Sequence, residues 1–119
     1  MSNALTASFE VAHFGMNCEN EEDALKQAQL LGGLFGLPIS EGKDSVYTGP
    51  LVELMKGGGR GKHGHIAIFT NDIHAARVLL EEMGYRFNED SAKYDGAGNL
   101  IVIYLEMEIA GFAVHLLRK

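Results

Sequence analysis

Four side chains that can bind a metal stand at matching places in two similar parts of the sequence. His13 and His65 each lie inside a short apolar segment, at residues 11–17 and 64–71. Glu53 and His115 each lie inside a second apolar segment nearer the end of each half. A fold that repeats one unit would bring the four side chains together around a pseudo-twofold axis. Imidazoles and a carboxylate in one cavity would form a site for a divalent metal.

Each of these residues also has a purely structural interpretation. A histidine inside a strand is more often a surface residue or a hydrogen-bonded core residue than a ligand. Glu53 is harder to explain in that way, because its neighbours Val52 and Leu54 are apolar. A carboxylate buried among such residues costs several kcal/mol unless it is paired or bound to metal. The equivalence of the two segment pairs therefore favours a metal site.

Three further residues are candidates for binding an anionic small-molecule substrate: Arg60, Lys62 and Tyr104. Arg60 and Lys62 stand in a glycine-rich stretch and could lie at the mouth of the cavity, although a solvated loop explains them better. The stretch 59–64 also matches the G-x-G-x-x-G pattern of dinucleotide sites. A strand and not a helix is expected to follow it, so no helix N-terminus is available for a pyrophosphate. We therefore reject a dinucleotide site.

The elements that must position these residues follow one plan twice, which predicts an α+β fold. In the first half, a strand at residues 7–17 precedes a helix capped by Asn20 and ended by Gly36. Three short strands are expected at 39–41, 45–48 and 51–56. Alternation in the first strand predicts that Phe9, Val11, His13 and Gly15 share one face.

The second half begins after the glycine-rich break at residues 57–61. It repeats the plan with a strand at 65–70 and a helix capped by Asn71 or Asp72 and ended by Gly84. Further strands are expected to begin at 85–88 and to span 100–106 and 112–117, whereas 89–94 has no clear pattern. We therefore expect one domain at 7–119, with a first module at about 7–57 and a second at about 62–118.

Composition limits the classes of function. The 119 residues carry a net charge of −6, and the ten Lys and Arg residues are scattered, so a nucleic-acid partner is not expected. No apolar run approaches the roughly 18 residues of a membrane helix. The single cysteine, Cys18, cannot form an internal disulfide and fits a reducing cytoplasm. Residues 1–6 resemble a remnant of an expression tag or a disordered natural start, and a remnant would fit a domain cut from a longer chain.

The segments around the four candidate ligands resemble the vicinal oxygen chelate superfamily, which includes glyoxalase and bleomycin-resistance proteins. Residues 64–68 resemble that family's Gly-His-Ile-Ala strand, residues 111–116 its closing segment, and residues 51–54 its first ligand strand. The resemblance implies two βαβββ modules that form a cupped mixed or antiparallel sheet around one divalent metal, which would be Zn, Ni, Mn, Co or Fe. The implied ligands are His13, Glu53, His65 and His115.

The same resemblance implies a metal-dependent lyase or isomerase that acts on a small keto or hydroxy acid through a metal-chelated enediolate. Glu53 would be the candidate base and His115 the alternative. Proteins of this fold often pair, so a homodimer is expected. Two features depart from the family pattern. His115 stands where the family usually has Glu, so a bound divalent ion would leave a net charge of plus one. The family's glutathione-binding Arg is missing, with Asn17 near its place, which makes glutathione a poor candidate substrate.

A closer resemblance is to the C-terminal domain of some bacterial 2-keto-3-deoxy-6-phosphogluconate/4-hydroxy-2-oxoglutarate aldolases. Residues 13–20, 91–95 and 103–106 carry it. It implies an alternative function as a non-catalytic binding or regulatory module, with an aldolase domain as a possible partner in a parent chain. A simple dimerisation domain is a third interpretation. The aldolase's own barrel and Schiff-base lysine are absent from these 119 residues.

Overall fold

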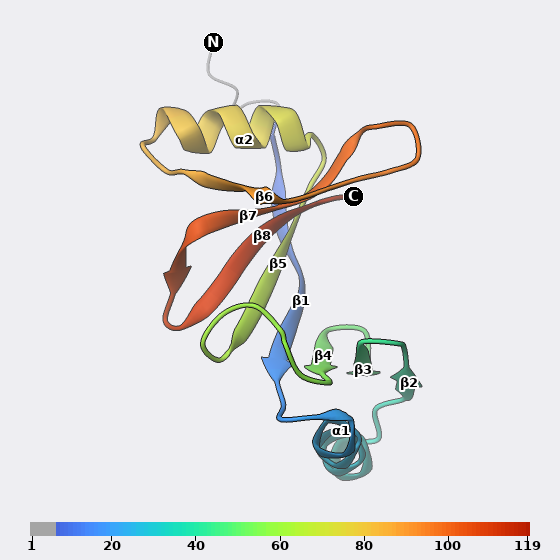
Figure 1. The fold of residues 1–119 in the computed structure, drawn as a ribbon. Helices are drawn as coiled ribbons and strands as arrows, with labels where there is room; N and C mark the ends of the chain where they lie inside the picture. Colours follow the sequence, from blue (N-terminus) through green and yellow to red (C-terminus); the bar gives the residue numbers. More distant parts are fainter. Residues whose placement is uncertain (1–6) are drawn as a thin grey trace.

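Two β-α-β-β-β units follow one another along the chain and contribute to one sheet (Figure 1). The computed structural model describes residues 7–119, so the expectation for residues 1–6 lies outside the described residues. The first unit contains β1 (Phe9–Asn17), α1 (Glu21–Phe35), β2 (Ile39–Glu41), β3 (Ser45–Thr48) and β4 (Val52–Met55). The second contains β5 (Gly64–Thr70), α2 (Ile73–Glu82), β6 (Phe87–Tyr94), β7 (Leu100–Ile109) and β8 (Phe112–Arg118). This element order confirms the predicted α+β fold.

The eight strands form one mixed sheet in the order β2-β3-β4-β1-β5-β8-β7-β6. β1 and β5 pair in antiparallel fashion at the centre, where the two units join. On the outer side of this pair, β4 runs parallel to β1 and β8 runs parallel to β5. Equivalent strands of the two units therefore stand at equal distances from the centre, which is the arrangement that a pseudo-twofold axis requires.

Side-chain caps fix where the helices begin. The Asn20 side chain accepts a hydrogen bond from the backbone N–H of Asp23 at 2.8 Å, and three acidic residues occupy the first turn of α1. Of the two predicted caps for α2, Asp72 is the one used, and it accepts from Ala75 N at 3.0 Å. α1 ends at Gly36 in the left-handed conformation, as its sequence predicts.

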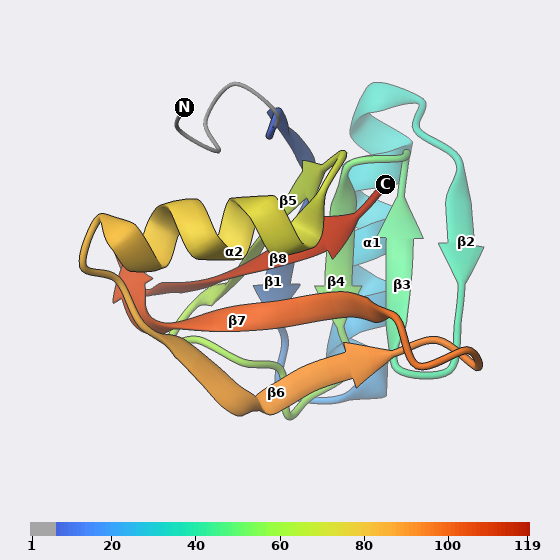
Figure 2. The ribbon, with the colours of Figure 1, turned by 90° about the horizontal axis from the view of Figure 1, so that it is seen from above.

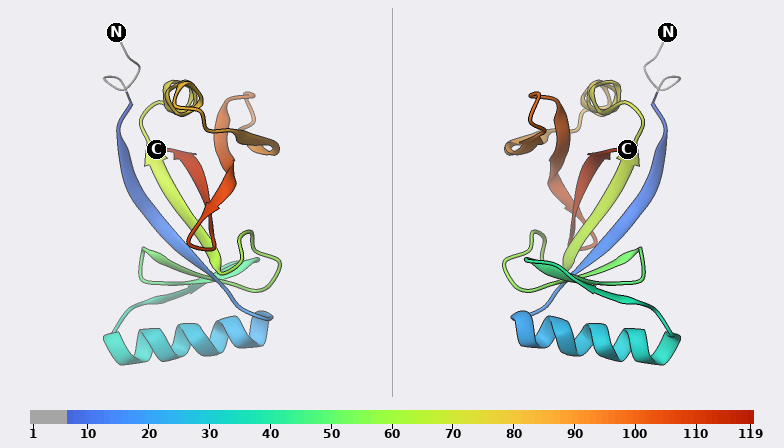
Figure 3. Two further views of the ribbon diagram at one scale, coloured as in Figure 1. Left: turned by 90° about the vertical axis from the view of Figure 1, so that its left-hand side faces the viewer. Right: turned by 90° about the vertical axis from the view of Figure 1, so that its right-hand side faces the viewer.

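Both helices cover the same face of the sheet, each over the outer strands of its own unit. α1 packs Ala24 and Ala28 on Val46 and Leu54 of β3 and β4. α2 packs on β7 and β8 through a second core cluster. Figure 3 shows α1 and α2 far apart, with the strands between them, and Figure 2 shows α1 behind β3 and β4. Because side chains alternate along a strand, the residues next to these core positions point to the face without helices.

Two strands differ from the expectation. β1 contains a bulge at Ala12, so that Val11 pairs with Ile68 and His13 pairs with Ala67. Ile68 and Ala67 point to opposite faces, and Phe9 pairs with Thr70 on the face of Ile68. The prediction that Phe9 and Val11 lie on the face of His13 is therefore wrong. β6 continues as a strand to Tyr94, through the segment 89–94 that showed no clear pattern, and its pairing with β7 is irregular. Tertiary pairing stabilises a strand there whose local sequence does not favour one.

Over residues 7–119, no helix combines the length and the apolar character that a membrane crossing needs.

Candidate metal centre

Strand register brings the four predicted ligands to the face without helices. Gly15 of β1 pairs with Glu53 of β4 on one side and with His65 of β5 on the other. Ala67, two residues along β5 from His65, pairs with the histidine of β1 and with the histidine of β8. Because directly paired residues share a face, these pairings place four metal-competent side chains on one surface.

The side chains converge closely. Ring nitrogens of His13, His65 and His115 all lie within 4.8 Å of one another. His13 Nε2 is 3.2 Å from His65 Nε2. Glu53 Oε1 lies 3.3 Å from His13 Nε2 and 3.1 Å from His65 Nε2. Two of these residues come from each unit of the chain, so both units are needed to form the cluster.

Gly15 leaves the space that the His65 ring occupies. A Cβ atom on Gly15 would lie 2.0 Å from His65 Cε1, far closer than two carbon atoms can approach. His65 is itself buried, so its ring has little room to move away. A glycine at this position is therefore part of the construction of the site.

Two neighbours of Glu53 on β3 are not among the residues that the sequence predicts for the site. Ser45 Oγ donates a hydrogen bond to Glu53 Oε2 at 2.6 Å. Tyr47 is the direct cross-strand partner of Glu53, and its ring lies edge-on to the His13 ring with centroids 5.7 Å apart. The alternation of Ser45 and Tyr47 with the core residue Val46 is a signal that could have found both.

The carboxyl group of Glu53 is ionised. Its burial acts to raise the pKa, but hydrogen bonds from His13, His65 and Ser45 outweigh burial and hold the pKa well below its usual range. Burial, with the Glu53 charge beside it, raises the pKa of Tyr47 to about 12. At neutral pH, the site therefore pairs a carboxylate with a protonated phenol.

His115 is neutral and has one ring nitrogen available. Only 5% of the residue is exposed, and burial lowers its pKa to about 4. His115 Nδ1 lies 3.0 Å from the carbonyl oxygen of Leu116. Since a carbonyl oxygen can only accept a hydrogen bond, Nδ1 carries the proton and Nε2 keeps its lone pair. That lone pair can bind a metal or accept a proton.

Of the three predicted substrate residues, Tyr104 lies beside His115, and Arg60 contacts Tyr104. The Tyr104 ring is 4.7 Å from the His115 ring, centroid to centroid. The guanidinium carbon of Arg60 lies 4.9 Å from the Tyr104 ring centroid. Arg60 and Tyr104 line a cleft of about 170 Å³ together with Glu106 and Glu108. Lys62 is exposed, and its backbone N–H donates to the Glu108 carboxylate at 3.4 Å.

Asn17 fixes the loop that carries Arg60. Its Nδ2 donates to the carbonyl oxygen of Gly61 at 2.9 Å and lies 3.4 Å from the carbonyl oxygens of Gly59 and Arg60. Asn17, which stands near the place of the family's glutathione-binding arginine, therefore holds the loop that carries Arg60.

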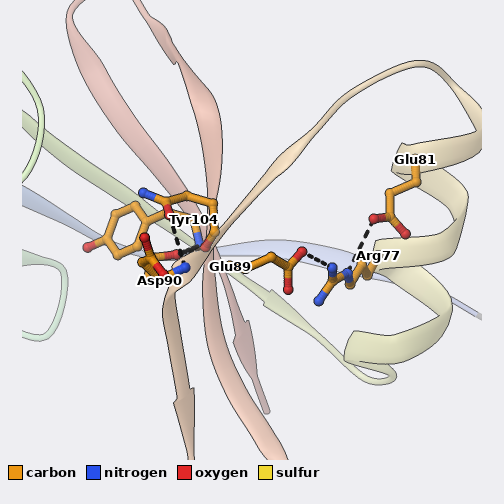
Figure 4. Close-up of polar contacts among 7 residues, drawn as sticks. Arg77, Glu81, Glu89, Asp90 and Tyr104 are labelled. Atoms are coloured by element: carbon orange, nitrogen blue, oxygen red, sulfur yellow. Dashed lines mark hydrogen bonds and ion pairs between the residues drawn. The ribbon is translucent and has the colours of Figure 1, made fainter.

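Hydrogen bonds across β6 and β7 hold Tyr104 in position. The Tyr104 backbone N–H donates to Ser91 Oγ at 2.8 Å, and Ser91 Oγ donates to the Asn88 carbonyl oxygen at 2.6 Å. Figure 4 shows a separate network in which Arg77 of α2 pairs with Glu81 and Glu89. Arg77 thereby links α2 to β6 and stays apart from Tyr104.

The donor set fits a divalent transition metal. Zinc, nickel and cobalt accept neutral imidazole nitrogens together with a carboxylate oxygen. Two ligand atoms that are each bound at about 2.05 Å to a tetrahedral ion lie about 3.3 Å apart. The measured separations of 3.2, 3.3 and 3.1 Å among the Nε2 and Oε1 atoms are close to that value. The ring nitrogen of His115 lies within 4.8 Å of those of His13 and His65, and Glu53 is outside this group of three.

No protein-family model and no curated protein matches the sequence. Solved structures match over most of the chain. A hypothetical protein from Bacillus halodurans C-125 gives a TM-score of 0.67 at 20% identity, with 94% of this chain and 95% of that chain covered. A methylmalonyl-CoA epimerase in complex with methylmalonyl-CoA and NH4+ gives 0.65 at 15% identity, with 92% and 93% covered.

A homoprotocatechuate 2,3-dioxygenase variant from Brevibacterium fuscum gives a TM-score of 0.60 at 16% identity, with 92% of this chain and 32% of that chain covered. The epimerase and the dioxygenase belong to the vicinal oxygen chelate superfamily, so the predicted glyoxalase-like fold is confirmed. Identities this low establish the fold and not the activity. None of the neighbours named here is an aldolase, and the aldolase resemblance stays a prediction.

Proposed function

We propose that this chain is a glyoxalase-like protein that binds a divalent metal and acts as a lyase or isomerase on a small keto or hydroxy acid. The observation that carries this proposal is the convergence of three imidazoles and one ionised carboxylate on the open face of the sheet. The shared fold with an epimerase and a dioxygenase supports it.

His13, Glu53, His65 and His115 would hold the metal. Three imidazole nitrogens and one carboxylate oxygen favour zinc, nickel or cobalt, with manganese and iron as further candidates. A divalent ion there would supply a Lewis acid that polarises the carbonyl or hydroxyl oxygens of a bound substrate. With one carboxylate among the ligands, the centre would keep a net positive charge, which suits an anionic substrate.

The chain's own residues would handle protons and substrate. Glu53 is the candidate base, and His115, whose Nε2 keeps a lone pair, is the alternative. The protonated phenols of Tyr47 and Tyr104 can donate hydrogen bonds at the rim. Burial raises the pKa of Tyr104, which keeps its proton in place. Arg60 is the cation best placed to receive an anionic group, because it stacks on Tyr104 beside His115.

Metal analysis tests the proposal directly. Protein prepared without chelator and then reconstituted with Zn, Ni, Mn and Co is expected to bind one ion per chain. His13→Ala and Glu53→Gln are expected to weaken binding strongly, because each removes a ligand. A wild-type chain that binds none of the four metals would contradict the proposal.

One observation favours a second candidate, a binding function without catalysis. The hydrogen bonds that hold the pKa of Glu53 below its usual range also make the carboxylate a weak base. A metal-loaded chain could then recognise an anionic ligand, such as a sugar-acid phosphate in an aldolase, without transforming it. Calorimetry with 2-keto-3-deoxy-6-phosphogluconate tests this alternative: heat of binding without turnover supports it, and no binding with or without metal opposes it.

We also propose that the chain forms a homodimer through the helix-covered face. β1 exposes apolar side chains between the helices, among them Met16, which is 48% exposed. Met16 also borders a groove of about 220 Å³ beside α1, lined by Leu30 and Leu34. A second copy would cover this surface, which is otherwise costly in water. Sedimentation is expected to show a dimer for the wild type and a monomer for Met16→Glu, and a monomeric wild type would contradict this proposal.

The cytoplasm remains the proposed location, since Cys18 is a free thiol.

A further inference from the structure

The two oxygens of the Glu53 carboxylate face different partners. Oε1 is the atom near the imidazoles, at 3.3 Å from His13 Nε2 and 3.1 Å from His65 Nε2. Oε2 points the other way and accepts a hydrogen bond from Ser45 Oγ at 2.6 Å. This bond has the short length of a hydroxyl that donates to an ionised carboxylate.

The fold holds Ser45 in place for this hydrogen bond to Glu53. It begins β3 and lies on the same face as Glu53, because Tyr47, two residues further on, pairs directly with Glu53. The residue is 7% exposed, so water has little access to compete for the bond. Its backbone carbonyl accepts a hydrogen bond from Gly42 N at 2.8 Å, which closes the turn before the strand.

We propose that Ser45 is a positioning residue that restricts Glu53 to binding a metal through one oxygen, Oε1. This inference rests on the proposed function, and it adds how the site selects its ion. A single carboxylate oxygen with three imidazoles suits ions that accept few, nitrogen-rich ligands, such as zinc, nickel and cobalt. Calcium and magnesium need more oxygen ligands, and a carboxylate held in this way cannot give calcium two.

A purely structural role for Ser45 predicts something different. If the hydroxyl only satisfied a buried carboxylate, its removal would lower the free energy of unfolding and leave the metal's coordination unchanged. If Ser45 positions Glu53, its removal frees Oε2 to reach the ion as well, which changes the number of oxygens bound. Outer-shell hydrogen bonds of this kind typically change metal affinity by about 10–100-fold.

The experiment compares the full chain with three variants, with Zn²⁺ affinity and the visible absorption spectrum of bound Co²⁺ as readouts. Ser45→Ala removes the hydroxyl, and Ser45→Thr keeps it. Thr48→Val is the matched control, because Thr48 lies on the same strand, is 1% exposed and has a hydroxyl without a partner among the described residues.

We expect Ser45→Ala to bind Zn²⁺ about 10–100-fold more weakly and to shift the Co²⁺ spectrum toward a higher coordination number. Ser45→Thr and Thr48→Val are expected to keep the wild-type affinity and spectrum. Wild-type affinity and spectrum in Ser45→Ala would overturn the inference and leave the proposed function standing.

Two results for the wild-type chain also test the inference about Ser45 without any variant. Binding of Ca²⁺ or Mg²⁺ as tight as that of Zn²⁺ would overturn the inference, even if Ser45→Ala failed to fold. No metal binding at all would overturn the proposed function and this inference with it.

Discussion

Glu53 and His115 occupy equivalent strands of the two units but differ in charge and in what holds them. Glu53 is an anion stabilised by two imidazoles and a serine hydroxyl. His115 is neutral because it is buried, and a backbone carbonyl fixes its tautomer. The pseudo-twofold symmetry therefore holds for position and not for electrostatics. A bound substrate would therefore face an anionic side chain on one side of the centre and a neutral one on the other.

The space at Gly15 leads to the first residue-level prediction. Gly15→Ala would push a methyl group into the His65 ring, so we expect metal affinity to fall by 10-fold or more and the free energy of unfolding to fall by about 1–3 kcal/mol. Calorimetry with Zn²⁺ and urea unfolding measure both. Gly33→Ala on α1 is the control, since a Cβ there meets nothing within 4 Å. We expect the free energy of unfolding of this variant to rise by about 0.5–1 kcal/mol. Undiminished metal affinity in Gly15→Ala would contradict the packing argument.

The buried, neutral state of His115 predicts that the metal-free protein loses stability in mild acid. The pKa of His115 is about 4 in the folded chain and 6.5 in an unfolded one, so the unfolded state binds its proton first as the pH falls. The stability from His115 is complete above pH 6.5 and is lost between 6.5 and 4. We expect a loss of about 2 kcal/mol by pH 5 and about 3 kcal/mol in total.

Urea unfolding from pH 7.5 to 4 measures this dependence. Glu53 contributes to the pH dependence of stability only at the lowest pH values of this range, because its pKa is lowered from an ordinary value of 4.5. His115→Gln removes the titrating group, so its stability is expected to change less over the same range. An identical pH dependence in both proteins would show that His115 does not titrate as its burial implies.

At the level of elements, local sequence signals were sufficient for the helices and most strands. Asn20, Gly36 and the alternation around residues 45–48 act through neighbours in sequence, and these elements appear where they were expected. The bulge at Ala12 and the strand through 89–94 depend on pairing with β5 and β7, which no local pattern encodes.

The candidate ligands could be chosen because the two units repeat. The roles of Ser45 and Gly15 could not be foreseen in the same way. Both roles arise from contacts across strands. The space beside Gly15 and the distance from Ser45 to Glu53 exist only in the assembled sheet.

The buried hydroxyl of Thr48 leads to a prediction about β3. Its Oγ1 has no partner among the described residues, although it lies beneath α1 where water is excluded. Thr48→Val keeps the shape and removes the unpaired polar group, so we expect the free energy of unfolding to rise by about 1–2 kcal/mol. Thermal and urea unfolding measure it, with Ser45→Ala as the opposite case, because that hydroxyl is bonded. A loss of stability in Thr48→Val would mean that the hydroxyl has a partner.

At the scale of the whole molecule, the metal would join the two units. His13 and Glu53 come from the first and His65 and His115 from the second, so only the folded chain presents all four. Zn²⁺ at 100 times its dissociation constant is expected to raise the free energy of unfolding by about 2.7 kcal/mol. For a domain of this size, that corresponds to a rise in Tm of several degrees.

Calorimetric melts with and without Zn²⁺ check this value. Glu53→Gln is the comparison, and we expect little increase in its Tm at the same zinc concentration. An equal increase in the wild type and in Glu53→Gln would show that zinc binds elsewhere on the chain.

The place of β8 as the last strand of the second unit has a consequence for the order of folding during synthesis. His115 lies 102 residues after His13, and β8 pairs with β5 in the middle of the sheet. A ribosome still translating the last strand holds a chain with three of the four candidate ligands and no β8 to cover β5. The complete centre can therefore form only once β8 has been synthesised and has paired with β5, so a shorter nascent chain cannot hold a metal ion with all four side chains.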